Sequence, residues 1–148
     1  MLAILIGVAM MMGLFMAIQP AINLELRRFV GSPAQAAMVS TSVSTISLAF
    51  FVFVVQRKPW PGLQAATTMP WWIWVGGLLG AAYVVMSVVL IQRLGAAFAF
   101  SLVILGQMGT AVVMDRLGWF GVTIHELTPG RLIGVALVVS GVVLIRLF

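Results

Sequence analysis

The stretch WWIWVGGLLGAAYVVMSVVLI, residues Trp71–Ile91, decides the fold class of this chain. It contains no charged residue, and a helix needs about 20 mostly apolar residues to cross the hydrocarbon core of a bilayer. A strand of a membrane barrel would alternate apolar and polar residues instead. The stretch therefore predicts a transmembrane helix.

The rest of the chain carries the same kind of segment. Of its 148 residues, 63% are hydrophobic and 7% are charged, which is too little charge to cover the surface of a soluble domain. We predict an all-α membrane protein, a single domain of five transmembrane helices. The expected spans are about 2–24, 33–55, 71–91, 95–114 and 130–147.

The basic residues lie near the ends of these spans, singly or in pairs. Five spans would place the two termini on opposite sides of the membrane. Each side then receives four of the eight Lys and Arg residues: Arg57, Lys58, Arg116 and Arg131 on the N-terminal side, and Arg27, Arg28, Arg93 and Arg146 on the other. Because cytoplasmic loops normally hold the excess of positive charge, an equal count specifies no orientation. We expect the chain to insert both ways and to pair with an inverted copy of itself, as in transporters with inverted repeats.

Several function classes have no support in the sequence. The net charge of +5 arises from these scattered residues and not from a basic patch, so nucleic acid is not an expected partner. The chain has no cysteine, and His125 and Glu126 have no neighbours in sequence to complete a metal-ligand set. Phosphate-loop and nucleophile motifs are also missing. We expect no metal, no cofactor and no enzymatic activity.

The first connection carries clear helix signals. Pro20 tends to kink a helix, and we expect the first helix to continue past it to about Phe29. Ser32 is a natural N-cap for the next helix, and Pro33 suits its first position. Only Gln92–Leu94 separates the third and fourth spans, so these two should be antiparallel neighbours.

Polar side chains inside the spans are the candidate substrate-binding residues. An unpaired amide in hydrocarbon costs on the order of one to several kcal/mol, so it lines a cavity or bonds across a helix interface. Both interpretations stand for Gln19 and Asn23, which share one helix face, and for Gln107. Tyr83 and Ser87 are further candidates for the cavity.

Glycine pairs mark candidate packing faces. Gly76 with Gly80 and Gly130 with Gly134 each form a GxxxG pattern, which lets helices approach closely.

Three carboxylates are available for coupling transport to an ion gradient. Proton-coupled carriers commonly use an acidic group inside the membrane. Glu25 and Asp115 are the candidates. The alternatives are an interfacial partner for Arg27 or Arg28 in the case of Glu25, and a helix end at the headgroups in the case of Asp115.

Several segments together resemble the YdcZ-like family of the drug/metabolite transporter superfamily, over nearly the whole chain and with similar spacing. They are Gln19-Pro20-Ala21-Ile22-Asn23, Leu26-Arg27-Arg28, Gly31-Ser32-Pro33, the run Trp71–Gly80, Gly106-Gln107, Asp115 with Gly118 and Gly121, and Arg131-Leu132-Ile133-Gly134. The resemblance implies half of a ten-helix transporter that occurs as an antiparallel homodimer, as paired chains or as a fusion. It transfers no catalytic residue.

We therefore expect a multi-pass inner-membrane carrier that exports a small organic solute as a dual-topology antiparallel homodimer. Its expected partners are membrane lipid, the small-molecule substrate and a second copy of the chain. The alternatives are a channel-like pore, a non-transporting scaffold or partner subunit, and a carrier that needs a different five-span chain.

Overall fold

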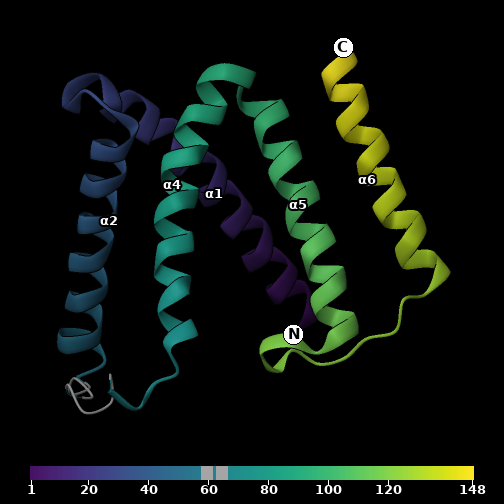
Figure 1. Cartoon of the computed structure of the whole chain (residues 1–148), viewed down its shortest axis with the longest axis horizontal. Coiled ribbons are helices and arrows are strands. Elements are labelled where there is room, and N and C mark those ends of the chain that lie inside the picture. Colours follow the sequence, from purple (N-terminus) through teal and green to yellow (C-terminus); the bar gives the residue numbers. More distant parts are fainter. Residues whose placement is uncertain (58–61, 63–66) are drawn as a thin grey trace. The chain divides into compact units, whose positions relative to one another are not determined.

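A computed structural model describes residues 1–57, 62 and 67–148 of the chain. Within these ranges the protein is helical without strands, and five helical segments are long and apolar enough to cross a membrane (Figure 1). The predictions of an all-α fold and of five membrane-length helices are confirmed. The five segments are α1 (Leu2–Val30), α2 (Pro33–Phe50) continued by the π-helical η1 (Phe51–Val55), the 3₁₀ turn η2 (Trp71–Trp74) with α4 (Val75–Leu94), α5 (Ala96–Leu117) and α6 (Pro129–Leu147).

Helix α1 extends beyond the predicted span end at Leu24. Its last turn contains Arg27 and Arg28, and cations are favourable at the negative end of a helix dipole. Gly31 then ends the helix in the left-handed conformation, with φ of 93°, and its N–H donates to the Arg27 carbonyl at 2.8 Å. The polar segment after Pro20 is therefore helical, as expected from the sequence.

The connection from α1 to α2 has the predicted capping geometry. The Ser32 hydroxyl accepts a hydrogen bond from the backbone N–H of Gln35 at 3.2 Å, and Pro33 occupies the first helical position. So short a connection makes α1 and α2 an antiparallel pair. The buried residues of α2 are the alanines Ala36 and Ala37, whose small side chains permit close packing.

Two compact units divide the chain, Met1–Gln92 and Arg93–Phe148, and each is described by itself. The expected neighbour relation between the third and fourth spans would cross from one unit to the other and stays a prediction.

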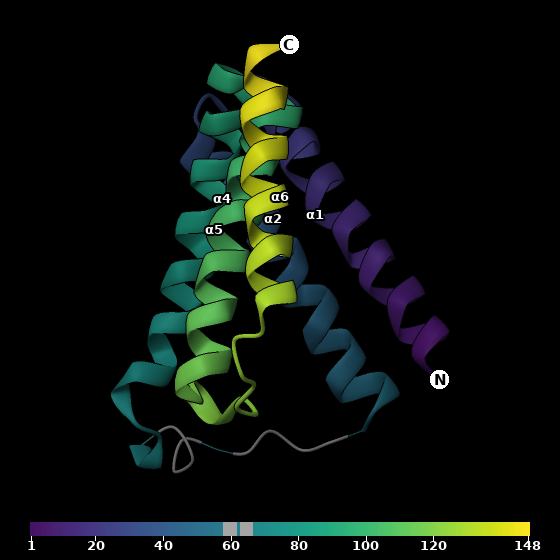
Figure 2. The same cartoon turned by 90° about the vertical axis from the view of Figure 1, so that its right-hand side faces the viewer.

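In the second unit, α5 and α6 lie side by side in both views (Figures 1 and 2). Gly118 ends α5 with φ of 66°, and its N–H donates to the Met114 carbonyl at 2.8 Å. The chain passes through the short 3₁₀ segment η3 (Trp119–Gly121) and returns to α6, which Thr128 caps. At the other end of the pair, the Arg146 guanidinium lies 5.3 Å from the centre of the Phe98 ring.

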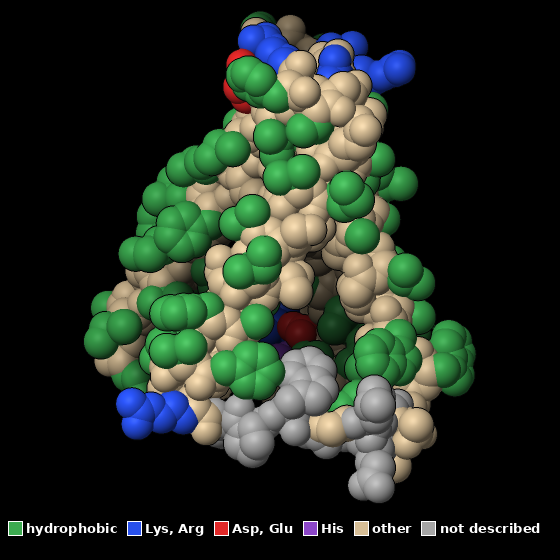
Figure 3. Space-filling model, turned by 90° about the vertical axis from the view of Figure 1, so that its left-hand side faces the viewer, with side chains coloured by type: hydrophobic (Ala, Val, Ile, Leu, Met, Phe, Trp, Pro, Cys, Tyr) green, Lys and Arg blue, Asp and Glu red, His purple; other side chains and the backbone are tan. Residues whose placement is uncertain are grey.

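Large apolar side chains are mostly exposed in this chain. Among the residues that the structure describes, only Val88 and Pro20 are large side chains with essentially no exposed surface. Hydrophobic side chains are scattered over the face seen in Figure 3, among backbone and other side chains. The apolar surface therefore faces lipid or another protein chain and not an internal core.

Candidate functional site

A groove of about 440 Å³ lies between α1 and α2. Both walls belong to the first unit, and the short capped connection at Ser32 joins them. Six of its lining residues come from α1 and four from α2: Phe15, Ile18, Gln19, Ile22, Asn23 and Leu26, with Val39, Ser40, Val43 and Ser44. Two of the predicted binding residues, Gln19 and Asn23, are thus brought together in one groove.

Asn23 is the most unusual residue of this groove. It is 2% exposed, and its Nδ2 atom is buried without a hydrogen-bond partner among the described residues. A buried donor left unpaired costs about 1–3 kcal/mol. A group that satisfies this donor therefore has to come from outside the described part of the chain.

Two serines complete the polar part of the groove. The Ser44 hydroxyl donates to the Ser40 carbonyl at 3.0 Å, as do most hydroxyls of α2 to carbonyls one turn earlier. The hydroxyl of Ser40 makes no hydrogen bond within the described residues, and the amide of Gln19 makes none either. The groove therefore offers uncommitted hydrogen-bonding groups on both of its walls.

No charged side chain lines the groove. Glu25 lies nearby in sequence but is exposed, and its carboxylate pairs with Arg28 of the same helix at 3.0 Å. The Arg27 guanidinium donates to the side-chain oxygen of Gln92. Glu25, the first coupling candidate, is thus placed in an exposed ion pair and outside the groove.

Tyr83 and Ser87 lie on α4 and do not line the groove. Ser87 is buried and its hydroxyl donates to the Val84 carbonyl at 2.9 Å, whereas Tyr83 is half-buried. Gln107 lies in the second unit, on an exposed part of α5, without a hydrogen bond among the described residues. The structure therefore does not join these three residues to Gln19 and Asn23.

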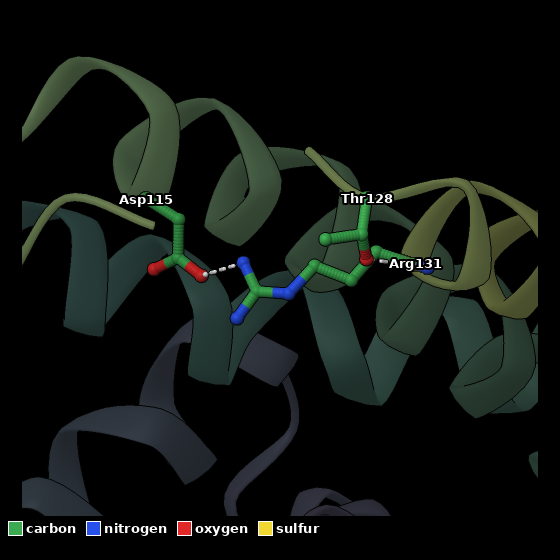
Figure 4. Close-up of polar contacts among 3 residues, drawn as sticks. All are labelled: Asp115, Thr128 and Arg131. Atoms are coloured by element: carbon green, nitrogen blue, oxygen red, sulfur yellow. Dashed lines mark hydrogen bonds and ion pairs between the residues drawn. The ribbon is translucent and has the colours of Figure 1, made fainter. Parts of the chain in front are cut away.

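Asp115, the second coupling candidate, forms an ion pair that links α5 to α6. Its Oδ2 atom lies 3.1 Å from the Arg131 guanidinium, while the Thr128 hydroxyl accepts from the Arg131 backbone N–H at 3.4 Å (Figure 4). The backbone N–H of His125 also donates to the Asp115 carbonyl at 2.9 Å. Both side chains are partly exposed, which suits a site at the membrane surface.

Helix dipoles explain why the ion pair between Asp115 and Arg131 is favourable. An anion in the last turn of a helix and a cation in the first turn each oppose their own helix dipole. Asp115 occupies the last turn of α5, and Arg131 the first turn of α6. Their ion pair brings each charge to the favourable end of the other helix.

The predicted packing glycines have open surroundings. A Cβ atom built on Gly76, Gly80, Gly130 or Gly134 would meet no atom within 4 Å. These small-residue faces are therefore not used for packing within the described part of the chain.

Sequence reasoning missed Ser40 and Ser44 as groove residues. Their spacing of four puts them on one helix face, which was visible in the sequence. The sequence could not tell which of the several hydroxyl faces of α2 lies against α1, because the helix is apolar or hydroxyl-bearing nearly all round.

Fold and groove define a class: a multi-pass α-helical membrane protein with an uncharged polar groove in its first unit. The model of a family described as "Putative inner membrane exporter, YdcZ" matches residues 4–144. The chain belongs to this family, which confirms the resemblance seen in the sequence and places the chain in the inner membrane. No curated protein and no solved structure matches the chain.

Proposed function

We propose that this protein is a secondary active exporter of a small organic solute and that it works as an antiparallel homodimer. The observation that carries the proposal is the α1–α2 groove with the unpaired donor of Asn23. An unsatisfied polar group is costly in a membrane helix and marks a functional position. A transported molecule that visits the groove satisfies the donor only while it is bound.

The charge distribution supports the antiparallel pair. Arg27, Arg28, Arg93, Arg116 and Arg146 all lie in the last turns of their helices. The equal count on the two sides gives no electrostatic preference for either orientation. Two inverted copies would then supply ten helices around a shared pathway, which opens to the two sides in turn.

The open glycine faces support a second copy as well. Gly76 and Gly80 on α4, and Gly130 and Gly134 on α6, present backbone that another helix can approach closely. We assign these faces to contacts between the two copies.

Coupling to an ion gradient is assigned to Glu25 or Asp115. Each carboxylate is held by an arginine, Glu25 by Arg28 within α1 and Asp115 by Arg131. The Asp115 ion pair joins two helices, so a change in this pair would act directly on helix packing.

Topology is the experiment that tests the proposal. The chain has no cysteine, so one cysteine added after Phe148 is a unique label for an impermeant thiol reagent applied to intact cells. About half of the chains should react if both orientations coexist. Complete labelling or none would overturn self-pairing by inversion and point to a different five-span partner.

The alternative of a pore is tested separately, on the purified protein. A carrier moves solute without sustained conductance, whereas a pore in a planar bilayer gives steady ionic current. Steady current would overturn the exporter.

A further inference from the structure

We infer that the α1–α2 groove selects neutral, largely apolar molecules that carry a hydrogen-bond acceptor, and that the Asn23 side chain donates to that acceptor. The inference rests on the proposed function, since it names the substrate class of the same site.

The absence of charge on the groove walls determines the neutrality of the ligand. All ten lining residues are uncharged, and the nearby ionic groups are already engaged: Glu25 with Arg28, and Arg27 with Gln92. A charged ligand would leave water without gaining a partner of opposite charge. That transfer is strongly unfavourable in a low-dielectric site.

The apolar walls indicate that most of the ligand surface is apolar. Phe15, Ile18 and Ile22 line the α1 side, and Val39 and Val43 line the α2 side. Contact between such walls and an apolar ligand surface favours binding, whereas contact with a sugar-like or peptide-like surface does not.

The Asn23 side chain indicates that the ligand carries a hydrogen-bond acceptor. Its Nδ2 donor is buried and has no partner within the described residues, whereas the hydroxyl proton of neighbouring Ser44 is already used on a backbone carbonyl. Gln19 and Ser40 also have uncommitted donors, but both residues are partly exposed, so water or lipid can satisfy these donors without a ligand. A ketone, ester, ether or amide oxygen would satisfy the donor when the Asn23 side chain turns its Nδ2 atom into the groove that the residue lines. A hydrocarbon of the same shape would leave it unpaired, so the site should discriminate between the two.

The test uses two competitors of one shape. 2-Acetylnaphthalene carries a carbonyl acceptor, whereas 2-isopropylnaphthalene has a methyl group in place of the oxygen. The purified full-length protein in phosphatidylcholine nanodiscs is photolabelled with benzophenone, and adducts on the groove segments Phe15–Leu26 and Val39–Ser44 are quantified by mass spectrometry.

In the unaltered protein, we expect the labelling of the groove to be saturable. 2-Acetylnaphthalene should suppress it at a concentration about three- to tenfold lower than 2-isopropylnaphthalene requires, because it forms one additional net hydrogen bond. In Asn23→Leu the two competitors should become equal. Gln56→Leu, an amide exchange at an exposed position outside the groove, should preserve the difference.

Two results would overturn the inference. One is equal competition by the two naphthalenes in the unaltered protein. The other is stronger competition by the anion 2-naphthoate than by the neutral ketone. A variant that fails to fold would lose helical circular dichroism, and Asn23→Ala then replaces Asn23→Leu.

This test is independent of export. A nanodisc has no second compartment and no gradient, so selective binding can be present even if the protein transports nothing. If the two competitors bind equally well but both orientations occur in cells, the substrate class is refuted and the antiparallel dimer is kept. Selective binding by a chain that has a single orientation in cells would keep the substrate class and remove the antiparallel dimer.

Discussion

At the scale of the residue, Asn23 places a hydrogen-bond donor where the described chain offers no acceptor. Gln19 and Asn23 could be selected from the sequence because amides within an apolar segment are costly there. The groove that these two residues share with Ser40 and Ser44 could not be predicted from the sequence, because it depends on the rotation of α2 against α1.

Replacing Asn23 tests whether its amide serves a ligand or a protein contact. Asn23→Leu keeps the branching of the side chain and removes the unpaired donor, so the ligand-free protein should become more stable by about 1–2 kcal/mol. The melting temperature of the purified protein in detergent measures this change, with Gln56→Leu as the exposed control. A fall in melting temperature would mean that Asn23 bonds to a second copy of the chain.

Gly118 is a position where a side chain is unfavourable. Its φ of 66° is unfavourable for other residues, and a Cβ atom there would lie 2.9 Å from the Cγ1 atom of Ile124. Gly118→Ala should therefore destabilise the second unit by about 1–3 kcal/mol, as measured by thermal unfolding. Gly121 has a φ of 80° in open space, so Gly121→Ala carries the backbone cost alone. An equal effect of the two substitutions would refute the steric contribution of Ile124.

At the scale of the element, the ends of the helices follow local rules that are readable in the sequence. Ser32 caps α2 as its position before Pro33 predicts, and the arginines of α1 lie in its last turn. The pairing of Asp115 with Arg131 was not readable, because each residue alone opposes the dipole of its own helix. Only the antiparallel packing of α5 and α6 shows that they compensate each other.

The Asp115–Arg131 ion pair should hold the second unit together. Asp115→Arg should destabilise it by placing two cations side by side, and adding Arg131→Asp should restore most of the loss by reversing the pair. We expect a coupling of about 0.5–1 kcal/mol, since both groups are partly exposed. Thermal unfolding in detergent, where membrane orientation has no influence, measures the cycle.

The ion pair within α1 is the matched control. Glu25 and Arg28 belong to one helix and are more exposed, so the same charge reversal, Glu25→Arg, should change the melting temperature little. A change as large as that of Asp115→Arg would contradict the role of the Asp115 pair in joining helices.

At the scale of the whole molecule, four basic residues on each side should leave orientation open. One added lysine should therefore have a visible effect. Gln56→Lys adds charge to the N-terminal side and should turn that side toward the cytoplasm, so labelling of a cysteine after Phe148 from outside should rise. Phe29→Lys adds charge to the other side and should lower it.

These two variants control for each other. Both introduce a lysine at an exposed position near a helix end, and they should shift the labelled fraction in opposite directions. Expressed together, the two oppositely oriented chains should associate. Equal labelling in both variants would mean that charge does not decide the orientation of this protein.

The sequence by itself determined the membrane class, the five helices, their caps and the family, because each of these depends on local hydropathy, spacing and capping chemistry. Only the tertiary structure decided which polar residues meet. Helices that are apolar nearly all round carry no periodic signal for the face that packs, so the groove at Asn23 and the pair at Asp115 depend on how neighbouring helices are rotated against one another.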